Sequence, residues 1–317
     1  MANKGAVKKT KKELEADKRS RMLKIILAAV LVLIMIIVPL ATLFNPTSLH
    51  NVNDNGDQKT GSFNSIADAL MDVPENANYV RFVDLNASQA ITNWTMASLG
   101  NNMPRADIFG MTPYKDVVAA FPYPTLGLAN VEDPQVVVLS DFGQAYDNAS
   151  YQKTTVGSAQ LRLVQGTYAF STDTYPTVSG RQEYVALIDS FIQGSTPSDS
   201  AYATYSDLIQ QANQSVQAAK FAVAGTSTSL GFGDRFYAAI VPLNDTRCAY
   251  KIAIHLNQTL NQSQTQDIAD RWTTGASLYG IDAQAPQFKS GYVVMTAEGD
   301  IDNCLNDMVT NWDFIRG

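Results

Sequence analysis

Histidine and cysteine, two residue types that often carry catalysis or bind metals, are rare in this chain of 317 residues. The two histidines are His50, in a polar segment, and His255, on the outward face of a predicted strand. The two cysteines, Cys248 and Cys304, fall on the apolar faces of a predicted strand and a predicted helix. A structural zinc site takes four ligands, and a catalytic histidine needs a nucleophile or an acid beside it. Neither pattern is present, so we expect no metal, no cofactor and no enzyme activity.

One glycine-rich loop and one acidic pair have the residue types of an ion site. In the loop TSTSLGFGDRF, Gly231 and Gly233 would let backbone N–H groups approach an anion. The loop lacks the known phosphate-binding patterns and precedes a predicted strand, so a hairpin turn is the simpler interpretation. Asp300 and Asp302 stand at a predicted helix start, where carboxylates meet unpaired N–H groups. We therefore expect a structural role for both features.

The two cysteines can be interpreted in two ways. Both face the interior of the same predicted lobe, so Cys248 and Cys304 are candidates for a disulfide bond. Such a bond would close a loop of about 56 residues and contribute roughly 4 kcal/mol by chain-entropy reasoning. The alternative is a pair of buried, unpaired thiols, which behave as small apolar side chains.

Seven Asn-x-Ser/Thr triplets, the signal for N-linked glycosylation, follow the apolar segment described below. Twenty Asn residues lie in this part of the chain, and a chance distribution of Ser and Thr would place about three of them in such triplets. The excess favours a glycosylated surface. The alternative is a Ser-, Thr- and Asn-rich surface that carries no sugar. The candidate acceptors are Asn86, Asn93, Asn148, Asn213, Asn244, Asn257 and Asn261.

The strand pattern around RCAYKIAIHLN indicates which way Asn257 points. Cys248, Tyr250, Ile252 and alternate residues after them are apolar, whereas the intervening positions are more polar. Successive side chains in a strand point to opposite faces, so Asn257 projects outward at the strand end. Asn261 falls in the turn before the next predicted helix.

The segment of residues 25–44, IILAAVLVLIMIIVPLATLF, contains twenty uncharged residues. About 20 apolar residues span the hydrocarbon core of a bilayer as a helix. A cleaved signal peptide is the alternative, but this run is longer than a signal core and lacks a small-x-small cleavage site. We expect a retained transmembrane helix that contacts the lipid bilayer.

Charge predicts the orientation of this helix. Residues 1–24 carry nine Lys or Arg and three acids, a net charge of +6, whereas no Lys or Arg lies between residues 45 and 58. Basic flanks stay in the cytoplasm, so we expect a cytoplasmic tail and an extracellular C-terminal domain. Because the whole chain carries −7, the part beyond residue 24 carries −13, which argues against binding of nucleic acid.

The remaining chain predicts an α+β domain. Residues 45–62 are polar and indicate a stalk, and the turn-rich sequence STPSDS separates a first lobe, residues 63–196, from a second, residues 197–317. Each lobe alternates predicted strands with flanking helices, so we expect mixed, partly antiparallel sheets. The clearest predicted elements are strands at 78–85, 135–141 and 248–256 and helices at 201–219, 264–279 and 300–315. Residues 183–194 fit either a helix or a strand, and we favour a helix.

In overall style the chain resembles single-pass, N-glycosylated surface proteins of archaea, with a basic tail, an uncleaved anchor, an acidic ectodomain and few cysteines. The resemblance carries no specific motif and implies no site residue. The anchor, the stalk and the absence of a catalytic motif favour a non-enzymatic binding or scaffold domain, or an accessory subunit of a cell-envelope assembly, with an envelope or membrane protein as partner. The alternative is an extracytoplasmic enzyme, such as a hydrolase or protein-maturation factor, whose carboxylates converge only in the fold.

Overall fold

The computed structural model describes nine stretches of the chain: residues 63–101, 125–132, 135–140, 152–164, 167–171, 174–194, 197–212, 216–226 and 231–310. They belong to one compact unit, Gly56–Gly317. In these stretches no helix has the length and apolar character needed to cross a bilayer. The predicted tail, membrane helix and stalk, residues 1–62, lie outside the described residues, so they stay predictions.

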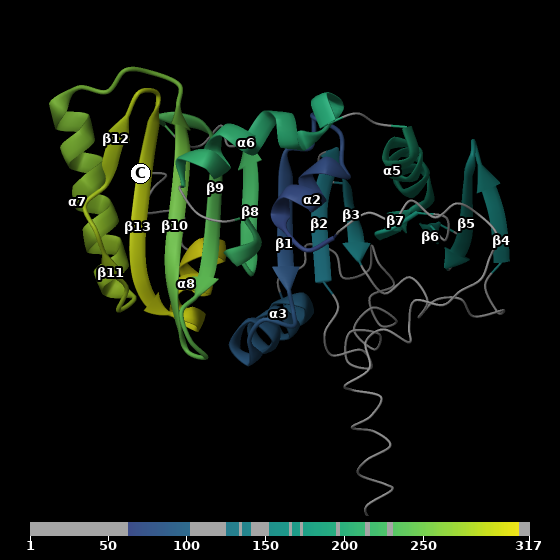
Figure 1. Cartoon of the computed structure of the whole chain (residues 1–317), viewed down its shortest axis with the longest axis horizontal. Helices are drawn as coiled ribbons and strands as arrows, with labels where there is room; N and C mark the ends of the chain where they lie inside the picture. The colour runs from purple at the N-terminus through teal and green to yellow at the C-terminus, as the bar shows by residue number, and fades with distance from the viewer. Residues whose placement is uncertain are drawn as a thin grey trace, which may run out of the picture. The chain divides into compact units, whose positions relative to one another are not determined.

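Within the described residues, thirteen strands form a single sheet (Figure 1). Its order is β11-β13-β10-β9-β8-β1-β2-β3-β7-β6-β5-β4, and β12 also pairs with β13. The strands are β1 Tyr79–Asp84, β2 Thr125–Glu132, β3 Gln135–Ser140, β4 Gln152–Val156, β5 Ala159–Val164, β6 Tyr168–Ser171, β7 Thr177–Arg181, β8 Phe221–Thr226, β9 Gly233–Pro242, β10 Arg247–Leu256, β11 Asp282–Ala283, β12 Gln287–Lys289 and β13 Tyr292–Asp300.

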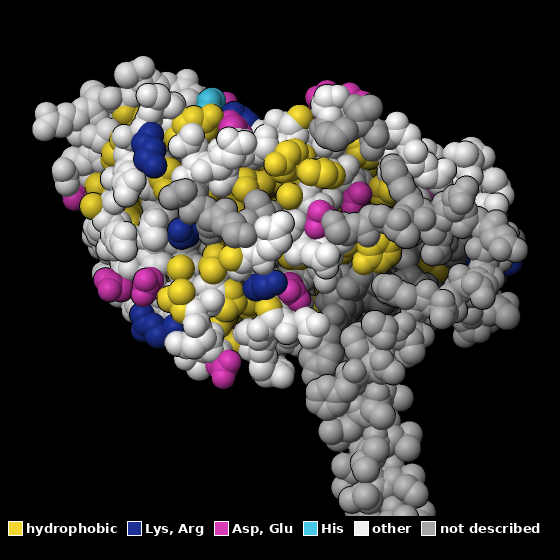
Figure 2. Space-filling model, in the orientation of Figure 1, with side chains coloured by type: hydrophobic (Ala, Val, Ile, Leu, Met, Phe, Trp, Pro, Cys, Tyr) yellow, Lys and Arg dark blue, Asp and Glu magenta, His cyan; other side chains and the backbone are white. Residues whose placement is uncertain are grey.

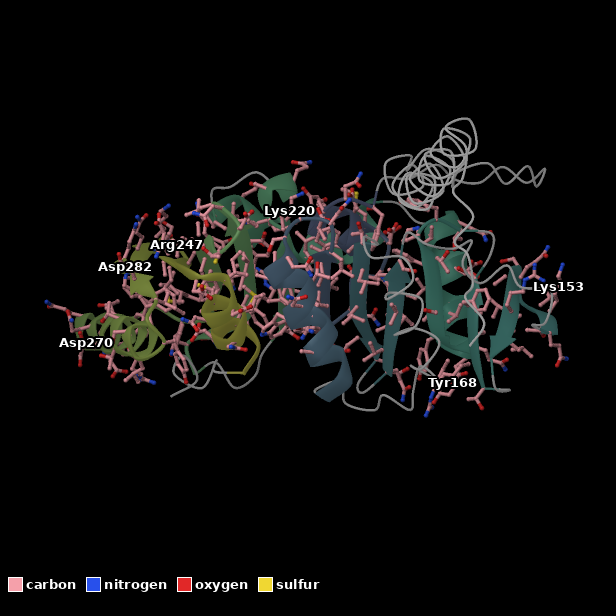
Figure 3. The ribbon with its side chains drawn as sticks, turned by 90° about the horizontal axis from the view of Figure 1, so that it is seen from below. Lys153, Tyr168, Lys220, Arg247, Asp270 and Asp282 are labelled. Carbon is pink, nitrogen blue, oxygen red and sulfur yellow. The ribbon has the colours of Figure 1, made fainter. Side chains whose placement is uncertain are left out.

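Helices cover both faces of this sheet, and Figure 1 shows α2 in front of it and α8 behind it. One face packs against α2, α5 and α6, and the other against α3, α7 and α8. In Figure 3, Lys153 of β4 and Asp270 of α7 mark the two ends of this layered unit. The helices are α2 Ile66–Met71, α3 Gln89–Asn101, α5 Gln182–Gly194, α6 Ala201–Gln211, α7 Gln262–Leu278 and α8 Ile301–Thr310, with short 3-10 turns η4 Pro197–Asp199 and η5 Val216–Ala218.

The expected α+β class is confirmed, but the sheet is not mixed. Every described strand pair is antiparallel. Connections of two to six residues join most consecutive strands, as between β2 and β3 or between β9 and β10. Such short connections permit only antiparallel pairing, whereas a parallel pair needs a crossover of a dozen or more residues.

Strand alternation divides the apolar residues between two cores. In β10, Cys248, Tyr250, Ile252 and Ile254 are fully buried under α7 and α8, as the sequence pattern predicts. Ala253 of the same strand belongs to the core on the opposite face. Because the middle strands have apolar residues on both faces, they form the centre of a three-layered unit.

The predicted boundary at residues 196 and 197 falls between strands that belong to one sheet. Strand β1, from before this boundary, pairs with β8, from after it, with Val80 opposite Ala224 and Phe82 opposite Ala222. The Lys220 ammonium bonds the Asp84 carboxylate at 3.0 Å at one end of this seam. The two predicted lobes therefore share both cores.

The two halves repeat part of their strand order on either side of this seam. From the β1–β8 seam outward, the first half of the sheet has the strand order β1-β2-β3-β7, and the second half has the corresponding order β8-β9-β10-β13. Helix α5 follows β7 directly and α8 follows β13 directly, but they cover opposite faces. On the face of β10 and β13 opposite α8, the described helix is α6, which contacts β9 and β10 and whose Asp207 accepts a hydrogen bond from Tyr292 of β13.

The backbone of Gly233 in β9 lies close to β10, with no room for a side chain. A Cβ added at Gly233 would lie 2.5 Å from Ile254 Cγ2 and 2.8 Å from the His255 carbonyl oxygen, whereas one added at Gly231 meets nothing within 4 Å. We expect Gly233→Ala to reduce the free energy of unfolding by about 1–3 kcal/mol, because the backbone must move apart. Gly231→Ala is the matched control and should change it by less than about 0.5 kcal/mol. Equal stability of the two variants in denaturant unfolding would contradict this packing.

Candidate functional site

The predicted glycan acceptors within the described residues all have exposed side chains. They are Asn86, Asn93, Asn244, Asn257 and Asn261. Asn148 and Asn213 lie outside the described residues. Exposure is the first requirement for an enzyme to reach an acceptor on a folded domain, so these five positions are compatible with modification.

Asn244 has the most favourable geometry of these acceptors. It lies in the exposed turn between β9 and β10, and its Oδ1 accepts hydrogen bonds from the Thr246 N–H at 3.0 Å and the Arg247 N–H at 2.9 Å. The Thr246 hydroxyl lies 3.3 Å from the same Oδ1. All three bonds use the amide oxygen, so the turn orders the acceptor without using Nδ2, the atom that would carry the sugar.

The other acceptors differ in their local structure. Asn261 is the N-cap of α7, where its Oδ1 accepts from the Gln264 N–H at 2.9 Å, and again Nδ2 is not the capping atom. Asn257 follows β10 directly, as predicted. Asn93 lies within α3, and the hydroxyl-bearing Thr95 of its triplet is 4% exposed. We therefore expect Asn93 to be a poorer acceptor than Asn244 once the domain has folded.

The two cysteines meet between β10 and α8. Both are 0% exposed, and their thiols are unpaired but hydrogen-bonded to each other. This hydrogen bond, followed by burial, raises the pKa of the Cys304 thiol. Gly299 of β13 lies opposite Cys248 in the sheet, and a Cβ there would lie 2.9 Å from Cys304 Sγ. The two thiols therefore lie side by side as a disulfide bond would require, and the bond itself stays a prediction.

A buried carboxyl group and a buried phenol lie beside the thiols. Asp307 of α8 is 1% exposed and Tyr250 of β10 is 0% exposed, and burial raises the pKa of both groups, for Asp307 to about 7. Tyr250 lies near enough to Asp307 to lower that pKa in part. However, none of the three oxygens makes a hydrogen bond of ordinary geometry within the described residues. We call Cys248, Tyr250, Cys304 and Asp307 the thiol–carboxyl cluster.

His255 belongs to a polar network on the opposite face of the sheet. Its Nδ1 lies 2.8 Å from Asp234 Oδ1, and its ring meets the ring of Tyr292 edge-on with centroids 5.3 Å apart. Figure 2 shows a histidine beside acidic and basic side chains near the upper edge of the view. The sequence analysis missed this pair because it depends on the register of the β9–β10 hairpin.

Arg235 and Asp207 continue this polar network. Arg235 donates to Asp207 at 3.1 and 3.2 Å, and Tyr292 donates to Asp207 Oδ2 at 2.8 Å. Burial alone would raise the pKa of Asp207, but the Tyr292 hydrogen bond and the charge of Arg235 outweigh it and hold the pKa below its ordinary value. Chemically, a His–Asp pair can orient an imidazole as a base, but both groups are substantially exposed, at 30% and 50%.

The glycine loop and the acidic pair have the structural roles expected from the sequence. Gly231 precedes β9 and Gly233 is the first residue of that strand. The Asp302 N–H donates to Asp300 Oδ1 at 3.0 Å at the start of α8. Burial, and then the Asp300 charge, raises the pKa of Asp302. In the part of the chain that the structure describes, no group of three or more His, Cys, Asp or Glu is arranged to hold a metal ion.

Comparison with protein-family models, with curated proteins and with solved structures finds no match for this chain. The thiol–carboxyl cluster therefore has to be interpreted from its own geometry. The apolar stripe of the predicted C-terminal helix runs through Ile301, Cys304, Leu305 and Met308, and Asp307 lies beside this stripe rather than on it. The burial of Asp307 therefore follows from the packing of α8 on the sheet and could not be expected from helical spacing.

Asp307 should make the domain more stable in mild acid than at alkaline pH. Its folded-state pKa of about 7 exceeds the ordinary 3.8, so the folded state binds more protons between these values. Stability therefore falls as pH rises from about 4 to 7, by about 4 kcal/mol in total, and is then constant for this group. Asp307→Asn should remove the fall and give the more stable protein at pH 8.

Denaturant unfolding at pH 5 and pH 8 measures this effect. Asp270→Asn removes an exposed carboxylate from α7 and is the control for the loss of one negative charge. If Asp307→Asn and the native protein lose the same stability between the two pH values, Asp307 is not a buried acid.

Proposed function

We propose that the chain is a membrane-anchored, extracytoplasmic and N-glycosylated domain that binds or scaffolds another protein of the cell envelope. The apolar segment of residues 25–44 and the basic tail before it favour the anchor and its orientation. The glycoprotein part rests on the seven acceptor triplets. The binding part rests on the sheet surface described below.

The observation that carries the proposal is the exposure of every described acceptor, together with the geometry of Asn244. Five triplets selected by sequence alone have their Asn on the surface of a domain with two extensive cores. Of these, Asn244 has both its amide oxygen and its Thr246 hydroxyl fixed in one turn. An ordered, exposed acceptor suits modification of a folded protein.

Glycopeptide mapping of the native protein tests the modification. We expect a sugar mass at Asn244, and at Asn257 or Asn261, because these acceptors are exposed in turns or at element ends. Asn244→Gln should remove one sugar from the intact mass, whereas Asn303→Gln, an exposed Asn outside any triplet, should not change it. Unmodified peptides at all seven acceptors would contradict the glycoprotein proposal.

A polar surface of β10 and β13 supports the binding role. On the face opposite α8, half-buried Lys251 lies opposite half-buried Thr296, and exposed Glu298 lies opposite Ala249. On this face α6 contacts β10, and its Asp207 bonds Tyr292 at the start of β13. A sheet surface with both charge signs suits a partner of mixed polar character better than it suits nucleic acid or lipid.

A charge reversal tests this surface. Lys251→Glu should reduce the recovery of the partner from mild-detergent extracts by about tenfold or more, because opposing like charges weaken association. Lys289→Glu makes the same change at an exposed lysine of β12 and should retain the partner. A protein that always purifies alone, or equal recovery with both variants, would count against the scaffold role.

The alternative of an extracytoplasmic enzyme is favoured by one observation, the His255–Asp234 pair at 2.8 Å. If this pair is a base, any hydrolytic activity found in a substrate panel should be lost in His255→Ala and reduced in Asp234→Asn. Activity that survives both substitutions would exclude the pair as its source.

A further inference from the structure

The thiol–carboxyl cluster places a carboxyl group among apolar side chains, with the Tyr250 phenol beside it. Burial of a carboxyl group costs several kcal/mol when it is ionised, and a Leu at the position of Asp307 would avoid that cost. The two thiols beside it are the groups in the cluster whose chemistry needs a base.

We propose that Asp307 accepts the proton of the Cys304 thiol when Cys304 forms a disulfide bond with Cys248 as α8 packs onto the sheet. The oxidant in this reaction is a small-molecule or protein disulfide. The proposed extracytoplasmic location is needed only to supply that oxidant.

The geometry brings the acid to the attacking sulfur. Asp307 lies three positions after Cys304 in α8, so their side chains are neighbours on the helix surface, and both are buried. Cys248 lies on the strand beneath, opposite Gly299, whose missing side chain leaves room for Cys304 Sγ. The carboxyl group therefore arrives with the Cys304 thiol whenever α8 packs against β10.

A base is needed because burial makes the thiolate scarce. In the reduced pair the hydrogen bond to Cys248, and then burial, raises the pKa of Cys304. Once Cys248 is held in the mixed disulfide, burial still favours the protonated form of the Cys304 thiol at neutral pH. The thiolate, rather than the thiol, attacks a disulfide. Transfer of the Cys304 proton to the Asp307 carboxylate leaves one negative charge in the core before and after, so no second buried charge is created.

Burial also makes this carboxyl a better base than an exposed one. It raises the pKa of Asp307 to about 7, closer to the value of an ordinary thiol. The ionisable groups that act on the cluster are Tyr250 and Cys248 of β10, Cys304 and Asp307 of α8, and Asp300 at the end of β13. No cation is among them, so a base rather than a positive charge promotes the thiolate.

The reaction balances in two exchanges. The Cys248 thiolate, accessible before α8 packs, attacks an oxidant R–S–S–R and releases R–S⁻, leaving a Cys248–S–S–R mixed disulfide. As α8 packs, Asp307 takes the proton of Cys304, and the Cys304 thiolate attacks Cys248 Sγ. The Cys248–Cys304 bond forms, a second R–S⁻ leaves and takes up a proton, and two R–SH are produced in total.

Refolding of the full chain tests the second exchange directly. The reduced, unfolded chain is refolded in detergent with glutathione disulfide at several pH values between about 5.5 and 8.5. Acid quenching, alkylation of remaining thiols and mass spectrometry then separate the dithiol, the mixed disulfide and the closed form. Asp302→Asn, on the first turn of the same helix, is the control for the loss of a charge from α8.

We expect the mixed disulfide to accumulate in Asp307→Asn and to close about tenfold or more slowly at pH 7, within the usual range for loss of a general base. The native closure rate should show an inflection near pH 7 that Asp307→Asn lacks, whereas Asp302→Asn should match the native protein. Closure by Asp307→Asn at the native rate with the native pH profile would overturn the proposal, as would a native chain that never closes. Because the oxidant is added in vitro, neither result depends on the proposed location or glycosylation of the chain, which are tested separately.

Discussion

The antiparallel pairing of β1 with β8 is the interaction on which the rest of the structure depends. It joins strands from before and after residue 196 into one sheet, with Val80 and Phe82 opposite Ala224 and Ala222. Without it, each core would be divided, because both clusters draw side chains from both halves. The small residues of β8 also leave room on one face for α2 and α6, which contact each other beside the seam.

The same pairing connects the fold to the proposed function. A continuous sheet holds both halves on one side of any membrane, so the acceptors after β1 and those after β10 must share a compartment. The thiol–carboxyl cluster lies in the second half of the sheet, under α8, the last described helix in the sequence. This helix, α8, covers the face opposite the one that α5 covers in the other half. The other face of β10 and β13 carries α6 and the polar surface that we propose as the binding surface.

Local patterns in the sequence were sufficient for several elements. The alternation in residues 248–256 identified the buried face of β10. Residues 183–194 fitted a helix or a strand, and the favoured helix is α5. The exposed turn at Asn244 followed from its position between two strands. The continuous sheet was not predictable in this way, because the β1–β8 register joins residues more than 130 positions apart. For the same reason, the pairing of His255 with Asp234 depends on a hairpin register that composition does not fix. Asp307 lies beside the apolar stripe of its helix rather than on it, so only the packing of α8 shows that this residue is buried beside two thiols.

The central claim is that the folded domain lies outside the cell, and surface labelling of lysines in intact cells tests it most directly. Lys153 of β4 and Lys289 of β12 are exposed and lie in the two halves of the sheet. A membrane-impermeant amine reagent should label both lysines in intact cells, to the same extent as in opened cells. Labelling of neither residue until the cells are opened would place the domain in the cytoplasm and contradict the account.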